Sequence, residues 1–394
     1  MKLLVLTKLF PNNINPIFGV FVKERIKALA QNCEVKVVAP VPWAPPLKQF
    51  KKWYYFSQVC DQEIIDGLEV FHPRYINPPK IGRSLYGFFY YLGIISLINK
   101  IYKEFKFDFI DVHWAYPDGF GAILVSRYFN KPCVITVRGS DINSFTNKPF
   151  LRSLILYTLQ NATTVLAVSH DLKKKMIKLG CAEQNIQVIP NGVDPSLFYP
   201  ISKTKARSNL DLGSDLKILL AVGNLIPLKR FHLLIDCMYH IVKKNENKNI
   251  KLIIIGEGNQ RKNLKEQVAQ LSLQPNIKFV GRVNHHEMYL WYNAADLLTV
   301  VSESEGCPNI ILEALACGTP VLAYSTGGIP EIINQKVGML VNDVAPHYFA
   351  RMVEKALNKN WQKNSIISHA KLYTWDTISK KIIEQYKPLL KKNH

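Results

Sequence analysis

Two glutamates, Glu305 and Glu313, stand eight residues apart where an apolar strand passes through a glycine- and proline-containing loop into a helix. The backbone N–H groups of Asn309 and Ile310 open this helix, and a helix start favours a bound anion. A carboxylate repels a phosphate but accepts hydrogen bonds from sugar or ribose hydroxyls. The segment therefore predicts a site for an anion with hydroxyl groups beside it. The alternative is that Glu305 caps the helix and Glu313 faces solvent.

Short apolar strands alternate with amphipathic helices along the chain, which is typical of parallel sheets covered by helices on both faces. In the first half, we expect strands at residues 3–7, 35–39, 109–113, 134–138, 163–168 and 187–189. Helices are expected there at residues 20–30, 119–129, 150–160 and 171–179. Asp66 and Gly67 lie between two short strand-like runs and predict a hairpin turn.

The pattern stops in a stretch rich in proline, asparagine and serine at residues 189–205, which we interpret as a linker. It then restarts, with strands expected at residues 217–222, 251–255, 277–280, 297–301, 320–323 and 338–341. The predicted fold class is α/β, with two doubly wound Rossmann-like domains that face each other across a cleft. The predicted domains are residues 1–195 and 196–374, and a last helix at 375–391 packs back on the first domain.

The segment that carries the two glutamates resembles the signature of glycosyltransferase family 4, in both its E-x7-E spacing and its surrounding residues. Members of this family have the GT-B fold, use nucleotide-sugar donors and retain the configuration of the transferred sugar. The resemblance implies that Glu305 contacts hydroxyls of the donor sugar and that Glu313 binds the ribose. The amides of Asn309 and Ile310 would hold the diphosphate.

Residues 220–230, which read LAVGNLIPLKR, are similar to another segment of the family. Lys229 matches the lysine that neutralises the donor diphosphate, although an ordinary surface lysine is the alternative. Two residues depart from the pattern: Asn224 stands where the family usually has arginine, and Arg230 stands where it has glycine. Arg230 could restore the charge that is lost at Asn224.

Three further segments of the second half match the family. The run at residues 280–283 resembles the segment beside the nucleobase, which makes Arg282 a donor-binding candidate or else a surface arginine. Residues 327–331 match a loop that closes the cleft. The G-x-G at residues 256–258 is a weak signal that we interpret as a tight turn.

The first half offers four candidates. Gly19 resembles the family's glycine loop, which lets the backbone approach the donor or the acceptor, and a left-handed structural glycine is the alternative. His113 lies at a strand's carboxyl end, where the family has a histidine that meets the donor sugar and the acceptor. Arg138 replaces the usual histidine of the next strand and could bind an anionic acceptor, which Asp141 could orient.

These resemblances predict a hexosyltransferase that moves a sugar to a lipid-linked or glycan acceptor. The chain most resembles members that build bacterial surface polysaccharides of the teichuronic-acid type. The sequence has no D-x-D pair and no zinc-ligand spacing, so we expect a metal-independent reaction without a cofactor. A nucleotide-sugar epimerase, a phosphorylase of the same fold and a non-catalytic glycan-binding protein are the alternatives.

The chain of 394 residues carries 50 basic and 30 acidic residues, a formal charge of +20. This surplus is spread over both halves, so it attracts polyanions without forming a basic tail. No nucleic-acid motif is present, and we expect no nucleic-acid partner. Aromatic and basic side chains interleave at residues 43–56 and 84–107, which suits an anionic membrane surface, although core packing beside a solvated face explains them too.

Seven cysteines without a C-x-x-C pair favour a reducing compartment. The start of the chain reads as a buried strand rather than a signal peptide. We therefore expect a cytoplasmic protein that binds peripherally to the inner face of the plasma membrane.

Overall fold

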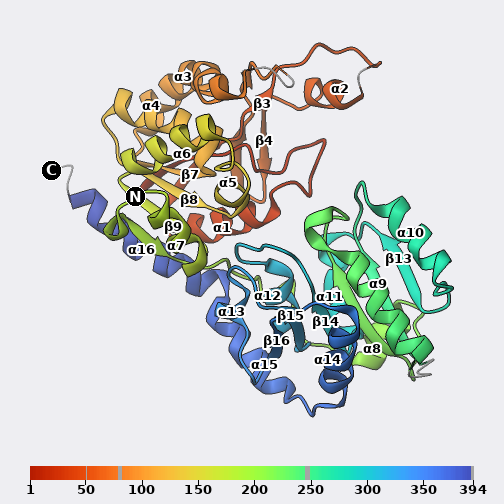
Figure 1. The fold of residues 1–394 in the computed structure, drawn as a ribbon. Helices are drawn as coiled ribbons and strands as arrows, with labels where there is room; N and C mark the ends of the chain where they lie inside the picture. The colour runs from red at the N-terminus through yellow and green to blue at the C-terminus, as the bar shows by residue number, and fades with distance from the viewer. Residues whose placement is uncertain (50, 79–81, 245–248, 392–394) are drawn as a thin grey trace. The chain divides into compact units, whose positions relative to one another are not determined.

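The computed structural model describes residues 1–49, 51–78, 82–244 and 249–391, which form two compact units (Figure 1). The N-terminal unit comprises residues 1–191 together with the chain from Ile378 onward, and the C-terminal unit comprises residues 192–377. The division after Asn191 lies four residues before the boundary that the sequence predicted.

The N-terminal unit is built on an eight-stranded sheet in the order β10-β9-β8-β7-β1-β2-β5-β4. Every neighbouring pair is parallel except β4 and β5. Strands β7 and β8 are buried along their whole length, which explains their nearly continuous apolar sequences. The strands are β1 (Lys2–Leu6), β2 (Glu34–Val38), β4 (Gln62–Ile65), β5 (Leu68–Phe71), β7 (Phe109–His113), β8 (Cys133–Val137), β9 (Thr164–Ala167) and β10 (Ile186–Val188).

The predicted hairpin joins the antiparallel pair β4 and β5. Asp66 and Gly67 both have positive φ, 49° and 82°, as a two-residue hairpin turn requires. The short strands β3 (Val41–Pro42) and β6 (Arg74–Tyr75) pair separately and were not predicted.

The helices of the N-terminal unit begin where local chemistry favours a helix start. The Ser169 hydroxyl accepts from the Leu172 amide at 3.3 Å and caps α7, while α6 opens with Pro149. The helices are α1 (Val20–Ala30), α2 (Lys51–Ser57), α3 (Tyr86–Phe105), α4 (Phe120–Phe129), α5 (Ser140–Asn143), α6 (Pro149–Asn161) and α7 (His170–Lys178). None of the helices in the described part of the chain has both the length and the apolar character needed to cross a bilayer.

The C-terminal unit has a sheet of six parallel strands in the order β13-β12-β11-β14-β15-β16. This is the strand order of a Rossmann fold, in which the direction of winding reverses between the first and fourth strands. The strands are β11 (Lys217–Val222), β12 (Ile250–Ile255), β13 (Ile277–Gly281), β14 (Leu297–Val300), β15 (Val321–Tyr324) and β16 (Gly338–Val341).

A buried apolar cluster joins β11 and β12 to helices of the C-terminal unit, with Ile235, Leu264 and Val353 among its members. The helices are α8 (Lys203–Asn209), α9 (Phe231–Tyr239), α10 (Arg261–Gln270), α11 (Met288–Ala294), α12 (Asn309–Ala316), α13 (Ile329–Ile332), α14 (Pro346–Asn358) and α15 (Lys363–Ala370). The predicted strands of both halves, the four predicted helices of the first half and the predicted last helix are confirmed to within one residue at each end.

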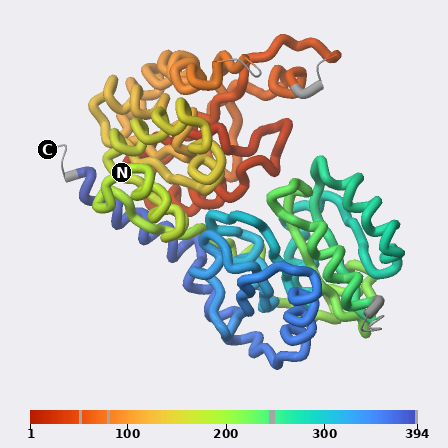
Figure 2. The backbone as a smooth tube through the Cα atoms, viewed as in Figure 1, coloured from red at the N-terminus to blue at the C-terminus, as the bar shows by residue number. Residues whose placement is uncertain are grey.

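The last helix, α16 (Trp375–Lys391), brings the end of the chain back to the N-terminal unit, as the blue tube shows (Figure 2). Tyr386 on this helix is fully buried, and its ring packs edge-on against Phe109 of β7 with 4.6 Å between centroids. The Tyr386 hydroxyl also lies 3.5 Å from Arg25 Nη2. The helix is therefore part of the core beneath the central strands.

Replacing Tyr386 should test this packing. Tyr386→Ala leaves a cavity against Phe109 and should cost about 3–5 kcal/mol of unfolding free energy. Tyr386→Phe keeps the ring and loses only the hydroxyl contact, so it should cost about 1 kcal/mol. Urea unfolding followed by tryptophan fluorescence measures both, and equal losses would show that the ring is not a core element.

Candidate functional site

The candidate donor residues of the C-terminal unit lie beyond the carboxyl ends of its strands. Strands β11 and β14 are neighbours in the sheet, and the winding reverses between them. Lys229 lies in the loop after β11, and Glu305 lies in the loop after β14. Ligands of doubly wound sheets bind at this switch point, where adjacent loops separate.

Lys229 and Glu305 form an ion pair between Nζ and Oε1. Their side chains retain 20% and 11% of their exposure, so both charges are largely removed from water. Gly223 has a φ of +152°, which favours glycine, and a Cβ built there would make only an ordinary contact of 3.7 Å with Lys229 Cε. The sequence placed both residues in the donor site, and the structure brings them together.

The loop of Glu305 is held by the loop that follows β15. Gly328 donates from its amide to the Glu305 carbonyl at 3.2 Å, and the Thr326 hydroxyl donates to the Glu303 carbonyl at 2.8 Å. Gly327 has a φ of +54°, and a Cβ on it would lie 1.9 Å from the Glu305 carbonyl oxygen. The glycine is thus required by the close approach of two backbones.

Helix α12 begins directly after this loop, with Asn309 and Ile310 as its first residues. Its N-cap is Pro308, without a side-chain capping bond, while the Glu305 carboxylate pairs with Lys229. The alternative in which Glu305 caps the helix is therefore wrong.

Glu313 lies one turn further along α12 and is 8% exposed, so the alternative in which it faces solvent is also wrong. Tyr292 on α11 donates from its hydroxyl to Glu313 Oε2 at 2.6 Å. His285 Nε2 lies 3.5 Å from Glu313 Oε1. Burial and the Glu313 carboxylate raise the pKa of Tyr292 well above its usual value, which keeps the donating proton in place.

The sequence reasoning missed Tyr292 and His285. They lie 21 and 28 residues before Glu313, and no local spacing links them to it. The one available signal was polar and aromatic side chains in the element that follows the Arg282 segment.

Arg230 occupies a left-handed conformation with a φ of +51°, which favours the glycine that the family has there. Its guanidinium lies 3.4 Å from the Glu303 carboxylate and within 6.0 Å of the Tyr324 ring centroid. Asn224 and Arg282 are exposed at the carboxyl ends of β11 and β13.

The glycines at 256 and 258 serve backbone packing. A Cβ on Gly256 would lie 1.9 Å from the Gly223 carbonyl oxygen, and one on Gly258 would lie 2.3 Å from that of Leu225. The Leu225 amide donates to the Glu257 carbonyl at 2.9 Å. The two loops are packed together, in agreement with the tight turn that we predicted.

In the N-terminal unit, the winding reverses between β1 and β7. Gly19 starts α1 after the β1 loop with a φ of +68°, and a Cβ on it would lie 2.3 Å from the Leu9 carbonyl oxygen. This close packing explains why a glycine stands here, and no bound ligand is needed to explain it.

His113 ends β7 and is completely buried. Its Nδ1 lies 3.1 Å from Arg138 Nη2, and Arg138 Nη1 donates to Asn191 Oδ1 at 2.6 Å. Burial lowers the pKa of His113 well below its usual value, and the guanidinium groups of Arg138 and Arg25 lower it further. His113 is therefore neutral at physiological pH. The structure brings these two candidates of adjacent strands into contact.

Asp141 is completely buried at the start of α5. Its carboxylate accepts from the amides of Ala115, Arg138 and Gly139 at 2.8–3.3 Å. Burial raises its pKa, and these backbone donors lower it. The carboxylate thus joins the loops that follow β7 and β8.

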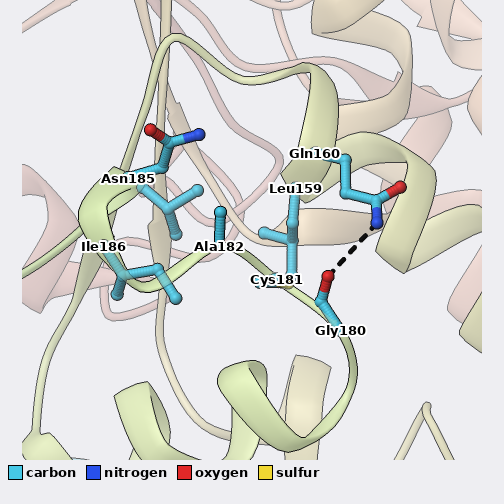
Figure 3. A pocket seen from close by; sticks show the side chains of 8 residues that line it. Leu159, Gln160, Gly180, Cys181, Ala182, Asn185 and Ile186 are labelled. Carbon is cyan, nitrogen blue, oxygen red and sulfur yellow. Dashed lines mark hydrogen bonds between the residues drawn. The ribbon is translucent and has the colours of Figure 1, made fainter.

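A small cavity of about 110 Å³ lies elsewhere in the N-terminal unit (Figure 3). The residues that line the cavity lie near the amino ends of β9 and β10, at the edge of the sheet opposite the candidate site residues. Gln160 Nε2 closes one side by donating to the Gly180 carbonyl at 3.2 Å. Burial raises the pKa of the lining Cys181 to about 11, so its thiol is protonated and not nucleophilic near neutral pH.

Across the described residues, no three His, Cys, Asp or Glu side chains gather as a metal site would require.

Two family models match the chain, one for each half. "Glycosyltransferase Family 4" matches residues 19–197, and "Glycosyl transferases group 1" matches residues 202–373. The chain therefore belongs to glycosyltransferase family 4, and its two Rossmann-like units are those of the GT-B fold. It is a glycosyltransferase of the hexosyltransferase type.

Among its relatives is TuaC of Bacillus subtilis, a glycosyltransferase provisionally named for teichuronic acid biosynthesis. It is 28% identical over 90% of this chain and 89% of its own length. The fold is similar to that of sucrose-phosphate synthase from Thermosynechococcus elongatus, with a TM-score of 0.80, 19% identity and 99% of each chain covered. It is also similar to Anabaena HepE in complex with UDP-glucose, with a TM-score of 0.73, 19% identity, and 98% of this chain and 99% of HepE covered.

The backbone contact at Gly327 predicts an unusually costly glycine replacement. Gly327→Ala combines a left-handed backbone with a collision against Glu305 and should lose about 2–4 kcal/mol of stability. Gly67→Ala is the matched control, because its φ is +82° but nothing lies within 4 Å of a Cβ there. It should lose about 1 kcal/mol. Chemical unfolding of both variants measures the difference, and equal losses would contradict the close contact.

Proposed function

We propose that the chain transfers a hexose from a nucleoside diphosphate sugar to a lipid-linked or glycan acceptor of bacterial cell-surface polysaccharide synthesis, with retention of anomeric configuration. The observation that carries this proposal is the Lys229–Glu305 ion pair at the switch point of the C-terminal sheet. The relation to TuaC supports the polysaccharide role. The HepE complex makes UDP-glucose the first donor to test.

The cation and the helix start would hold the donor diphosphate. Lys229 exchanges its Glu305 partner for the phosphates, and the amides of Asn309 and Ile310 supply hydrogen bonds at the start of α12. These groups carry the charge of the leaving nucleoside diphosphate, so the proposed reaction needs no metal ion. Arg230, Asn224 and Arg282 lie at the same edge and would contact the donor around them.

The two glutamates would bind the donor at different points. Glu313 is fixed by Tyr292 and would accept from the ribose hydroxyls. Glu305, released from Lys229, would accept from sugar hydroxyls next to the bond that breaks. As that bond breaks, positive charge develops on the sugar ring, and a nearby carboxylate stabilises it more than it stabilises the ground state.

The acceptor hydroxyl would attack from the side of the leaving group, because retention requires the new bond on the face that the diphosphate leaves. The bond from the anomeric carbon to the phosphate oxygen breaks while the bond to the acceptor oxygen forms. The acceptor proton passes to the departing phosphate oxygen. On the acceptor side, Arg138 would contact the acceptor, the buried His113 and Asp141 would hold Arg138 and its loop in place, and Gly19 would shape the adjoining loop.

We further propose that the N-terminal unit binds an anionic membrane surface on the cytoplasmic side, where a lipid-linked acceptor would be reached. Exposed apolar side chains gather in the two segments that the sequence singled out: Trp43, Leu47, Tyr55, Leu85, Phe88 and Leu92. Exposed lysines accompany them at positions 48, 100, 103 and 106. Phe50 and the side chains of Lys51 and Lys52 lie outside the described residues.

Conservative replacement of each glutamate tests the donor site. Glu305→Gln should lower kcat about 10²- to 10³-fold while UDP affinity is kept or increased, because Lys229 loses its competitor. Glu313→Gln should weaken the binding of UDP and of the nucleotide-sugar donor to a similar extent. A loss of about 1.4 kcal/mol of binding free energy corresponds to about a tenfold higher dissociation constant. Isothermal titration and steady-state assays, with and without EDTA, measure these effects.

Glu266→Gln on the exposed face of α10 is the matched control and should change neither quantity. Loss of UDP affinity in Glu305→Gln but not in Glu313→Gln would mean that the roles are exchanged. Wild-type kinetics in both variants, or loss of activity with EDTA, would contradict the proposed site.

Membrane binding is tested with vesicles. Co-sedimentation with anionic vesicles should fall with added salt and in the double variant Trp43→Ser, Lys48→Glu, since each surface charge contributes about 1 kcal/mol. The control is the double variant Leu372→Ser, Lys336→Glu, which replaces one exposed apolar and one exposed basic residue of the C-terminal unit. It should bind to anionic vesicles as the wild type does. Equal binding to neutral and anionic vesicles would contradict the proposed electrostatic contribution to membrane binding.

A further inference from the structure

A line of buried polar side chains runs through the N-terminal unit from its last helix to the carboxyl edge of the sheet. Tyr386 of α16 lies 3.5 Å from Arg25 Nη2 on α1, and the same nitrogen lies 3.9 Å from Asp111 Oδ2 on β7. Asp111 Oδ2 lies 3.7 Å from His113 Nε2, and His113 Nδ1 lies 3.1 Å from Arg138 Nη2. The first four of these side chains are at most 2% exposed.

The last contact determines where the His113 proton is. A guanidinium group has donors only, so His113 Nδ1 must be the acceptor and cannot carry a proton. The ring is neutral, because burial and two nearby guanidinium groups lower its pKa well below the usual value. The single ring proton is therefore on Nε2.

Asp111 is the group that faces this proton. Residues two apart on a strand point to the same face, so Asp111 and His113 of β7 share one face of the sheet. The 3.7 Å separation is a charge contact rather than a hydrogen bond. Burial raises the pKa of Asp111 above its usual value, and Arg25, the Tyr386 hydroxyl and Arg138 offset part of this rise. A carboxylate at this position attracts the Nε2–H dipole and so favours the Nε2–H tautomer. It disfavours the Nδ1–H tautomer, in which the ring N–H would point at the N–H groups of Arg138.

We propose that Asp111 is a positioning residue for the transfer reaction: it fixes the tautomer of His113, which in turn fixes the guanidinium of Arg138 at the carboxyl edge. Arg138 is then held on both η nitrogens by uncharged acceptors, His113 and Asn191. The effect on turnover rests on the proposed function, because it assumes that the acceptor is bound at this edge. The assignment of the His113 tautomer does not depend on the proposed function.

Nitrogen NMR of the full chain labelled with ¹⁵N-histidine reads the tautomer directly. In the wild-type protein, His113, assigned by its loss in His113→Gln, should show an unprotonated Nδ1 and a protonated Nε2. Asp111→Leu removes the carboxylate that faces Nε2 and puts no hydrogen-bonding group in its place, so the Nδ1–H tautomer should appear and the Arg138 contact should be lost. With an acceptor available, kcat should fall about 10- to 100-fold with little change in the KM for donor, as for other residues that orient an active group.

A second variant tests the proposal if Asp111→Leu does not fold. Arg138→Met removes the donor to Nδ1, and the Nε2–H tautomer should persist if Asp111 is what fixes it. Tyr90→Phe is the control, since it removes a buried hydroxyl of the same unit that lies beside Asp118 and Tyr75, and it should leave the tautomer unchanged. An Nδ1–H or charged ring in the wild type, a mixture of tautomers in Arg138→Met, or an unchanged tautomer in Asp111→Leu would each overturn the proposal. If no donor supports turnover, the proposed function fails while the tautomer result still stands.

Discussion

The ion pair between Lys229 and Glu305 depends on the fact that parallel strands end at the same edge of a sheet. The two residues are 76 positions apart in the chain, yet β11 and β14 are neighbours, so their loops emerge side by side. At this edge, the reversal of winding separates the loops and leaves room for a ligand. In the C-terminal unit, Gly327 and Gly328 hold the Glu305 loop and so help to keep the pair in place.

The same constraint applies to the N-terminal unit, but there the charged groups are deeper. Asp111, His113 and Arg25 are almost completely removed from water, which is costly unless each charge has a counterpart. Arg25 faces Asp111, and the neutral His113 separates Asp111 from Arg138. Helix α16 completes this arrangement through Tyr386, so the last helix contributes to the polar line as well as to the apolar core. The Lys229–Glu305 pair, in contrast, keeps 20% and 11% of its side-chain exposure.

The elements and the principal candidates could be predicted from the sequence because their signals are local. Apolar runs and capping residues determine the strands and helices, and the E-x7-E spacing identified Glu305 and Glu313. The partners of these residues could not be found in this way, since Tyr292, His285 and Arg25 reach their sites only through the tertiary fold. Asp111 was not among the candidates from the sequence: two-residue spacing puts it on the same face as His113, but only the structure shows Arg25 beside it. Arg230 shows a further limit, because its positive φ is invisible in the residue type.

The central claim is that the switch point of the C-terminal sheet binds the nucleoside diphosphate. Hydrogen–deuterium exchange with UDP, or with ADP or GDP where UDP gives no thermal shift, tests it directly by locating the backbone amides that become protected. Protection is expected at residues 223–230, at the start of α12 and in the loop at residues 325–328. Protection confined to other parts of the chain at saturating nucleotide, or none at all, would contradict it.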